Sequence, residues 1–163
     1  MLETISLWLH GTAAGRMLLT FFISMLPVVE LRAGLPAGVA MGLPIPAAFV
    51  ASLLDNMLPV PFIILFVRQI FQWVRVHIPR LGGFVSRLEA RAKEKSADVA
   101  RYEVWGLLIF VAIPLPGTGA WTGAMIAAVL DMRLKRAVPT IFLGVVVAGC
   151  IITVLTYGVA LLL

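Results

Sequence analysis

Glu30 and Arg32 stand in the apolar sequence PVVELRAGLPAG (27–38), where a carboxylate and a guanidinium are out of place. A charge at the centre of a membrane helix costs roughly 2.5–3.5 kcal/mol on insertion scales, so charges in such a segment are by default a functional-site hypothesis. A guanidinium binds anionic groups such as phosphate, and a carboxylate beside it can exchange a proton, because burial favours its neutral form and the arginine its charged form. We therefore predict that Arg32 binds substrate and that Glu30 couples to protons. The alternative is that both only pin the backbone through hydrogen bonds.

A second broken apolar stretch, IPLPGTGAWTGAM (113–125), offers backbone dipoles instead of charged side chains. A helix that starts after Gly117–Thr118–Gly119, with Thr118 or Thr122 as its cap, would present free N–H groups, which bind anions. We predict that Gly117, Thr118 and Gly119 contact substrate; glycines needed only for a tight turn and close packing are the open alternative. Their spacing fits neither a dinucleotide fingerprint nor a P-loop, so no nucleotide cofactor is expected.

Asp55 is the only charge in the apolar run 47–67 and precedes a pair of prolines that would kink the span. We predict that Asp55 is a second proton-coupling residue, with a buried capping role as the alternative.

The residues predicted to break helices are Pro27, Gly34, Pro36, Pro59, Pro61, Pro114 and Pro116. In an unwound tip, Glu30 and Arg32 would project to the same side, which a helix would not allow. This arrangement predicts an ion pair between them, with a pair across the site to Asp55 as the open alternative.

Composition supports a membrane setting for these residues. The chain is 61% hydrophobic and 13% charged, whereas soluble domains have about 25% charged residues. One cysteine and two histidines far apart predict neither a disulfide framework nor a metal site. Eight of the thirteen Lys and Arg residues lie between Arg68 and Arg101 and three between Arg133 and Arg136, a topology signal that argues against nucleic acid as the partner.

The elements that would hold these residues follow from hydropathy and charge. Residues 47–67 and 137–163 are long enough to cross the membrane as helices. Residues 17–43 and 104–131 are broken in the middle. Because basic residues flank 104–131 on both sides, a re-entrant helical hairpin that enters and leaves at the cytoplasmic face is favoured over a full crossing. Residues 68–103 form a basic, amphipathic cytoplasmic segment next to anionic headgroups or in solvent, and 1–16 form an interfacial N-terminal segment without a signal-peptide pattern.

We predict an all-α integral membrane protein built as one domain from an inverted repeat of hairpin plus transmembrane helix. We predict that the protein lies in the inner membrane as a multi-pass protein with both termini on the outer side. The polar backbone of half-depth hairpins must be shielded from lipid by protein, so a homodimer or higher homo-oligomer is expected.

Three segments carry a resemblance to a known family: SMLPVVELRAGLPAGVAMGLP, LLDNMLPVPFIILF and IPLPGTGAWTGAMIAAVLDM. Over about residues 18–163 the chain resembles the bacterial small multidrug export family, a relative of the DedA and VTT-domain membrane proteins. The resemblance implies two re-entrant hairpins that face each other, and the DedA relatives are implicated in moving lipid carriers such as undecaprenyl phosphate across the bilayer.

Three functions fit these features. The first is a secondary transporter or lipid translocase, in which the headgroup of an anionic amphiphile meets Arg32 and the Gly117–Thr118–Gly119 tip while protons act through Glu30 or Asp55. The second is proton-coupled export of cationic drugs, which Arg32 would disfavour. The third is a scaffold that transports nothing. An enzyme is not expected, because no nucleophile, base and orienting group occur together, and no cofactor or metal is predicted.

Overall fold

The computed structural model describes residues 11–24, 30–100, 103–115 and 117–158, and over these ranges the regular elements are helices. The chain divides into two compact units: unit 1 comprises Met1–Leu58 and Val145–Leu163, and unit 2 comprises Pro59–Gly144. Each unit is described by itself. Pro27, Pro116 and the first ten residues of the predicted interfacial segment lie outside the described residues.

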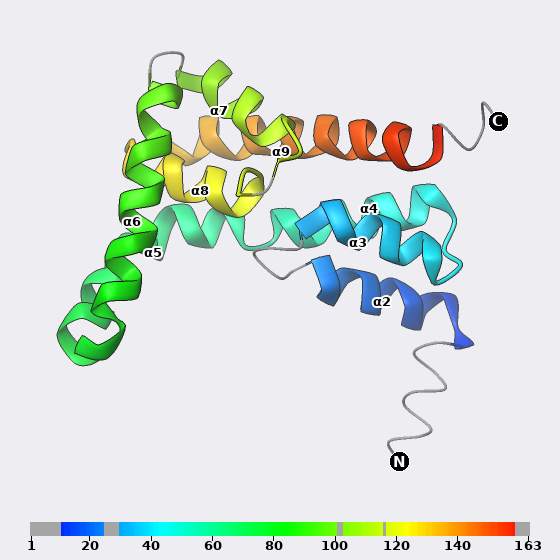
Figure 1. Ribbon diagram of the computed structural model, residues 1–163, viewed down its shortest axis with the longest axis horizontal. Coiled ribbons are helices and arrows are strands. Elements are labelled where there is room, and N and C mark those ends of the chain that lie inside the picture. The colour runs from blue at the N-terminus through cyan, green and yellow to red at the C-terminus, as the bar shows by residue number, and fades with distance from the viewer. Residues whose placement is uncertain (1–10, 25–29, 101–102, 116, 159–163) are drawn as a thin grey trace. The chain divides into compact units, whose positions relative to one another are not determined.

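Among its described residues, unit 1 includes α2 (Ala13–Ser24), α3 (Glu30–Ala40) and α4 (Ile45–Met57), which pack against one another. Figure 1 shows them side by side, in blue to cyan. A small residue allows this approach, because a Cβ on Gly38 of α3 would lie 2.7 Å from Thr20 Oγ1 of α2. Small residues at helix contacts are the usual way for apolar helices to approach closely.

The turn between α3 and α4 is fastened by an arginine from α2. Arg16 Nη1 donates to the carbonyl of Met41 at 2.9 Å, and Gly42 occupies the turn with φ 85°, a conformation that favours glycine. Within the range 17–43, α2 and α3 pack on each other, and a tight turn at Gly42 leads from α3 into α4.

Two of the predicted helix breaks are wrong. α3 runs without interruption through Gly34 and Pro36, so neither residue breaks a helix. A helix tolerates an internal proline when its neighbours pack around it, and Gly34 and Leu35 beside it are buried. Pro36 still has a local effect, since it has no N–H to donate to the carbonyl of Arg32 four residues earlier.

In the described part of unit 2, the helices that lie wholly within the unit are α5 (Val60–His77), α6 (Pro79–Ala100), α7 (Glu103–Ala112) and α8 (Ala120–Val129). α6 crosses α5, α7 and α8, and α8 packs on both α5 and α7 (Figure 1). α6 is the amphipathic helix predicted within 68–103, with Val85 and Ala92 buried two turns apart. Pro59 lies in the break between α4 and α5 as predicted, whereas Pro61 is accommodated in the first turn of α5.

α9 (Leu134–Thr153) begins in unit 2, ends in unit 1 and continues as a π-helical turn over Val154–Gly158. The described residues include two helical stretches long and apolar enough to cross a membrane, Ile45–His77 and Leu134–Gly158. The predicted spans differ from these at their ends. The first, 47–67, stops ten residues early, because α5 stays helical through its amphipathic end at His77.

Candidate functional site

The charged pair predicted from the sequence occurs in unit 1, at the first turn of α3. Arg32 Nη2 lies 3.8 Å from Glu30 Oε2, and their side chains are 18% and 6% exposed. The extended tip that we expected is not present, because both residues belong to the helix. Glu30 has φ 49°, in the left-handed region, and this backbone turn at the helix start accompanies the contact between residues two apart.

Asp55 belongs to the same unit, on α4, and is fully buried. Its Oδ1 accepts a hydrogen bond from Asn56 Nδ2 at 2.9 Å, and Asn56 also donates to the carbonyl of Ser52 at 2.7 Å. Ser52 and Asn56 are themselves buried, so α4 carries a compact polar cluster that we call the α4 cluster (Ser52, Asp55 and Asn56). α3 packs directly on α4, so Glu30 and Arg32 lie on the helix next to the one that carries this cluster.

The Gly117–Thr118–Gly119 segment belongs to unit 2 and connects α7 to α8. Gly117 and Gly119 have φ 80° and 114°, conformations that side chains rarely adopt. The Thr118 hydroxyl lies 2.7 Å from the carbonyls of both Ile113 and Leu115 and accepts from the Leu115 N–H at 3.2 Å. Thr118 therefore stabilises the connection itself.

The predicted threonine cap is consequently wrong. α8 has Gly119 at its N-cap and no side-chain cap hydrogen bond. Pro114 lies between the end of α7 at Ala112 and this turn, as a predicted break should. Among the described residues, no side chain therefore caps the start of α8. Gly119 is buried there and Gly117 is exposed.

Two features of these sites were missed in the sequence. Ser52 precedes Asn56 by one helical turn, and this spacing is the signal that would have placed both on one face of α4. Arg68 on α5 pairs with Asp131, 63 residues away, and no local pattern indicates such a contact. Within the described ranges, no three His, Cys, Asp or Glu side chains gather as a metal site would require.

The apolar composition, the helical elements and two stretches long enough to cross a bilayer are those of the class of helical membrane proteins. Residues 30–151 match the model of a family described as "Putative small multi-drug export protein". The chain belongs to this family, which confirms its resemblance to the small multidrug export proteins. No curated protein and no solved structure matches the chain.

Proposed function

We propose that the protein is a membrane transporter that moves an anionic amphiphile, such as a polyprenyl phosphate carrier, across the inner membrane. The observation that carries this proposal is the shielded Glu30–Arg32 pair at the start of α3. Arg32 is the more exposed partner, so an incoming ligand meets the guanidinium before the carboxylate. Their 3.8 Å separation is longer than the ~2.7–2.9 Å of a well-made charge-assisted hydrogen bond, so Arg32 can take a phosphate without first breaking a tight pair.

Competition for Arg32 supplies the coupling in this proposal. When phosphate binds the guanidinium, Glu30 loses its counter-charge, and a carboxylate left alone in a buried site is stabilised by taking up a proton. Release of the phosphate restores the ion pair and returns the proton to water. Binding of the phosphate by Arg32 is therefore coupled to uptake of a proton by Glu30. Asp55 on α4 is the second buried carboxylate that could hold this proton instead.

Export of cationic drugs is the second candidate, favoured by the family description and by the α4 cluster. A fully buried carboxylate such as Asp55 binds a cation strongly when ionised, because desolvation strengthens the attraction. In this case Arg32 would oppose binding, and its removal would help transport. The two candidates thus predict opposite effects of one substitution.

Topology and assembly belong to the same proposal. The helix pairs α2–α3 and α7–α8 would each enter and leave the membrane on one side, in opposite orientations, with 68–103 cytoplasmic and both termini outside. The DedA-like arrangement and a homodimer that shields the short helices from lipid complete it. Cross-linking in native membranes that yields only monomers would contradict the dimer.

The decisive experiment uses liposomes with a labelled polyprenyl phosphate or a cationic dye, with and without a pH gradient. For the anionic amphiphile, Arg32→Gln should slow transport about tenfold or more, since a charge-assisted hydrogen bond contributes roughly 1.5–3 kcal/mol, and Arg32→Lys should restore part of it. The exposed Arg136→Gln is the control for loss of a positive charge. Faster dye export in Arg32→Gln would favour the drug candidate, and no movement of either substrate by the folded protein would favour a scaffold.

The Gly117–Thr118–Gly119 segment is tested separately, as a second anion contact from the start of α8. Thr118→Ser keeps the hydroxyl and its hydrogen bonds, while Thr118→Val removes them. If transport of the labelled polyprenyl phosphate is the same in both variants, the Thr118 hydroxyl does not contact the substrate.

A further inference from the structure

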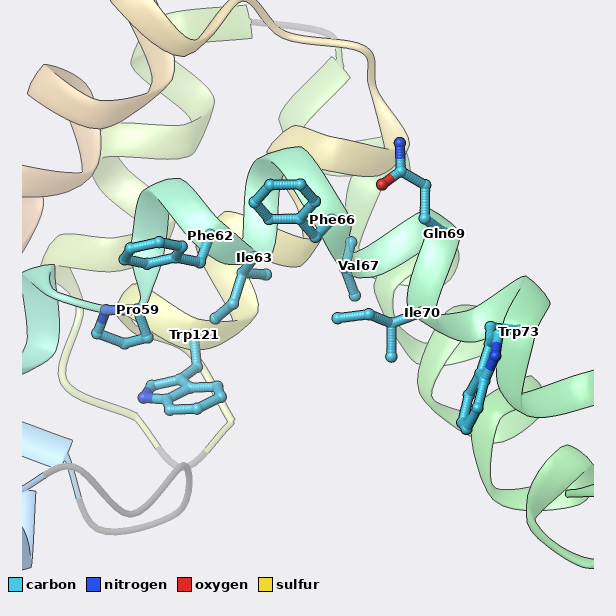
Figure 2. A pocket seen from close by; sticks show the side chains of 9 residues that line it. All are labelled: Pro59, Phe62, Ile63, Phe66, Val67, Gln69, Ile70, Trp73 and Trp121. Atoms are coloured by element: carbon cyan, nitrogen blue, oxygen red, sulfur yellow. The ribbon is translucent and has the colours of Figure 1, made fainter. Parts of the chain in front are cut away.

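An apolar groove runs along α5 inside unit 2 and is separate from the proposed transport residues. It has a volume of ≈ 790 Å³ and is lined by Pro59, Phe62, Ile63, Phe66, Val67, Gln69, Ile70, Trp73 and Trp121. Figure 2 shows Trp121 beside Pro59 and Ile63 at one end of the groove and Trp73 at the other. Its volume lies within the roughly 300–1,000 Å³ typical of ligand pockets, and its walls offer almost only hydrocarbon and aromatic surface.

Four of the large apolar side chains that line the groove are exposed to the surroundings of the protein. Phe62, Phe66, Ile70 and Trp73 are 45–59% exposed, and they recur at helical spacing on a stretch long enough to cross a membrane. Trp73 stacks on His77 at the end of this stripe, with ring centroids 4.8 Å apart. An aromatic residue at the end of an apolar span is typical of the membrane–water interface.

A polar pocket adjoins the groove and shares Val67 with it. This headgroup pocket, as we call it, has a volume of ≈ 280 Å³ and lies among α5, α6 and α8, with Arg68, Arg75, Lys93, Gln72 and Glu89 among its lining residues. Three cations face it against one carboxylate, and Asp131, the partner of Arg68, reduces the net charge to one positive.

The cations of the headgroup pocket remain accessible despite their partners. The Arg68 and Arg75 side chains are 47% and 44% exposed, although each pairs with a carboxylate, Asp131 and Glu89 respectively. A guanidinium carries five N–H donors in a fixed fork, so one carboxylate does not saturate it.

We propose that the groove and the headgroup pocket together bind one anionic phospholipid, with an acyl chain in the groove and the phosphate among Arg68, Arg75 and Lys93. Charge complementarity selects this occupant over a second copy of the chain, since another copy would bring the same positive surface. The apolar groove beside a basic pocket matches the two chemically different ends of a phospholipid. The site does not depend on the proposed transport function.

Tryptophan quenching by brominated lipid tests the proposal directly. In a protein that keeps only Trp73 (Trp8→Phe, Trp105→Phe, Trp121→Phe), dibromo-phosphatidylglycerol in mixed vesicles should quench at about fivefold lower mole fraction than dibromo-phosphatidylcholine, as expected for basic residues near an anionic headgroup. A protein that keeps only Trp121 serves as a second reporter from α8. Equal quenching by the two lipids at both positions would overturn the proposal, and so would no quenching at either, which would indicate a protein-covered groove.

A matched pair of double variants separates a site from general surface charge. Arg75→Gln with Lys93→Gln should abolish the preference for phosphatidylglycerol, whereas Arg87→Gln with Arg91→Gln, exposed on α6 and outside the pocket, should leave it unchanged. Equal losses in both double variants would reduce the effect to surface attraction and overturn the proposal. Because the readout is equilibrium quenching without a pH gradient, its result does not depend on whether the protein transports anything.

Discussion

Arg68 on α5 and Asp131, just after α8, form an ion pair of 2.6 Å, and Arg68 also donates to the carbonyl of Val129 at 2.9 Å. Arg68 therefore acts as the C-terminal cap of α8 from a different helix. Asp131 has φ 54°, so the pair holds a backbone turn that most residues resist. Since both side chains are largely exposed, the Coulomb energy of the pair contributes little to stability, and its main effect is to fix the position of the turn.

We expect Asp131→Gly to be close to neutral and Asp131→Ala to lower stability by about 1 kcal/mol relative to it. Glycine adopts a positive φ without strain and so offsets the loss of a surface pair contributing roughly 0.2–1 kcal/mol, whereas alanine loses the pair and keeps the strain. Thermal unfolding in detergent measures the difference. Identical unfolding temperatures for the two variants would show that the backbone at position 131 leaves the left-handed region when alanine replaces the aspartate.

Glycines in the helices of unit 2 should respond to alanine in opposite ways. A Cβ on Gly144 would meet Val111 Cβ at 2.7 Å and the backbone oxygen of Leu108 at 3.1 Å, and backbone cannot yield cheaply. Gly144→Ala should therefore destabilise by about 1–3 kcal/mol. Gly82→Ala in α6 has no atom within 4 Å and should stabilise by about 0.5–1 kcal/mol through helix propensity. Parallel thermal unfolding of the two variants checks both signs.

The connection before α8 should depend on its backbone conformation. Gly119 has φ 114° and ψ −168°, a region that is essentially limited to glycine. Gly119→Ala should cost about 1–3 kcal/mol and reduce the yield of folded protein. Ala120→Gly, one residue later in regular helix, is the control and should cost no more than about 1 kcal/mol. Comparable losses in both would contradict a special role for this turn.

Coupling to protons can be assigned to one carboxylate by neutral substitutions. We expect Glu30→Gln to abolish the acceleration of polyprenyl phosphate transport by a pH gradient while leaving a slow, gradient-independent rate. Asp55→Asn keeps the oxygen that accepts from Asn56 and so should preserve the fold. If acceleration survives in Glu30→Gln but disappears in Asp55→Asn, the proton site belongs to the α4 cluster instead.

The proposed orientation can be measured with single cysteines. In a Cys150→Ala background, Arg87→Cys on α6 should react with a membrane-impermeant maleimide only after the cells are opened, because 68–103 is expected to be cytoplasmic. Labelling of intact cells would reverse the topology. Arg87 is exposed and lies outside the headgroup pocket, so lack of reaction is not caused by burial or by a bound lipid.

The sequence predicted the helical class and the Glu30–Arg32 pair because charges and hydropathy are local signals. It misplaced the break around Gly34 and Pro36, because a proline in the sequence is compatible both with a helix end and with a helix that continues through the proline. The cap at Thr118 failed for a related reason: the hydroxyl has closer carbonyl partners at Ile113 and Leu115. The Arg68–Asp131 contact joins distant parts of the chain and depends on tertiary packing, for which a single sequence carries no pattern.

Pro36 leaves one further mark on the start of α3. Since it cannot donate to the carbonyl of Arg32, this oxygen must find its hydrogen bond outside the regular helix ladder. A carbonyl is a permanent dipole that no side-chain substitution removes. Even a variant in which Glu30 and Arg32 are both neutral would therefore keep this polar group at the start of α3. Pro36→Ala, which supplies an amide donor four residues along, is the change that would return the carbonyl to the helix ladder.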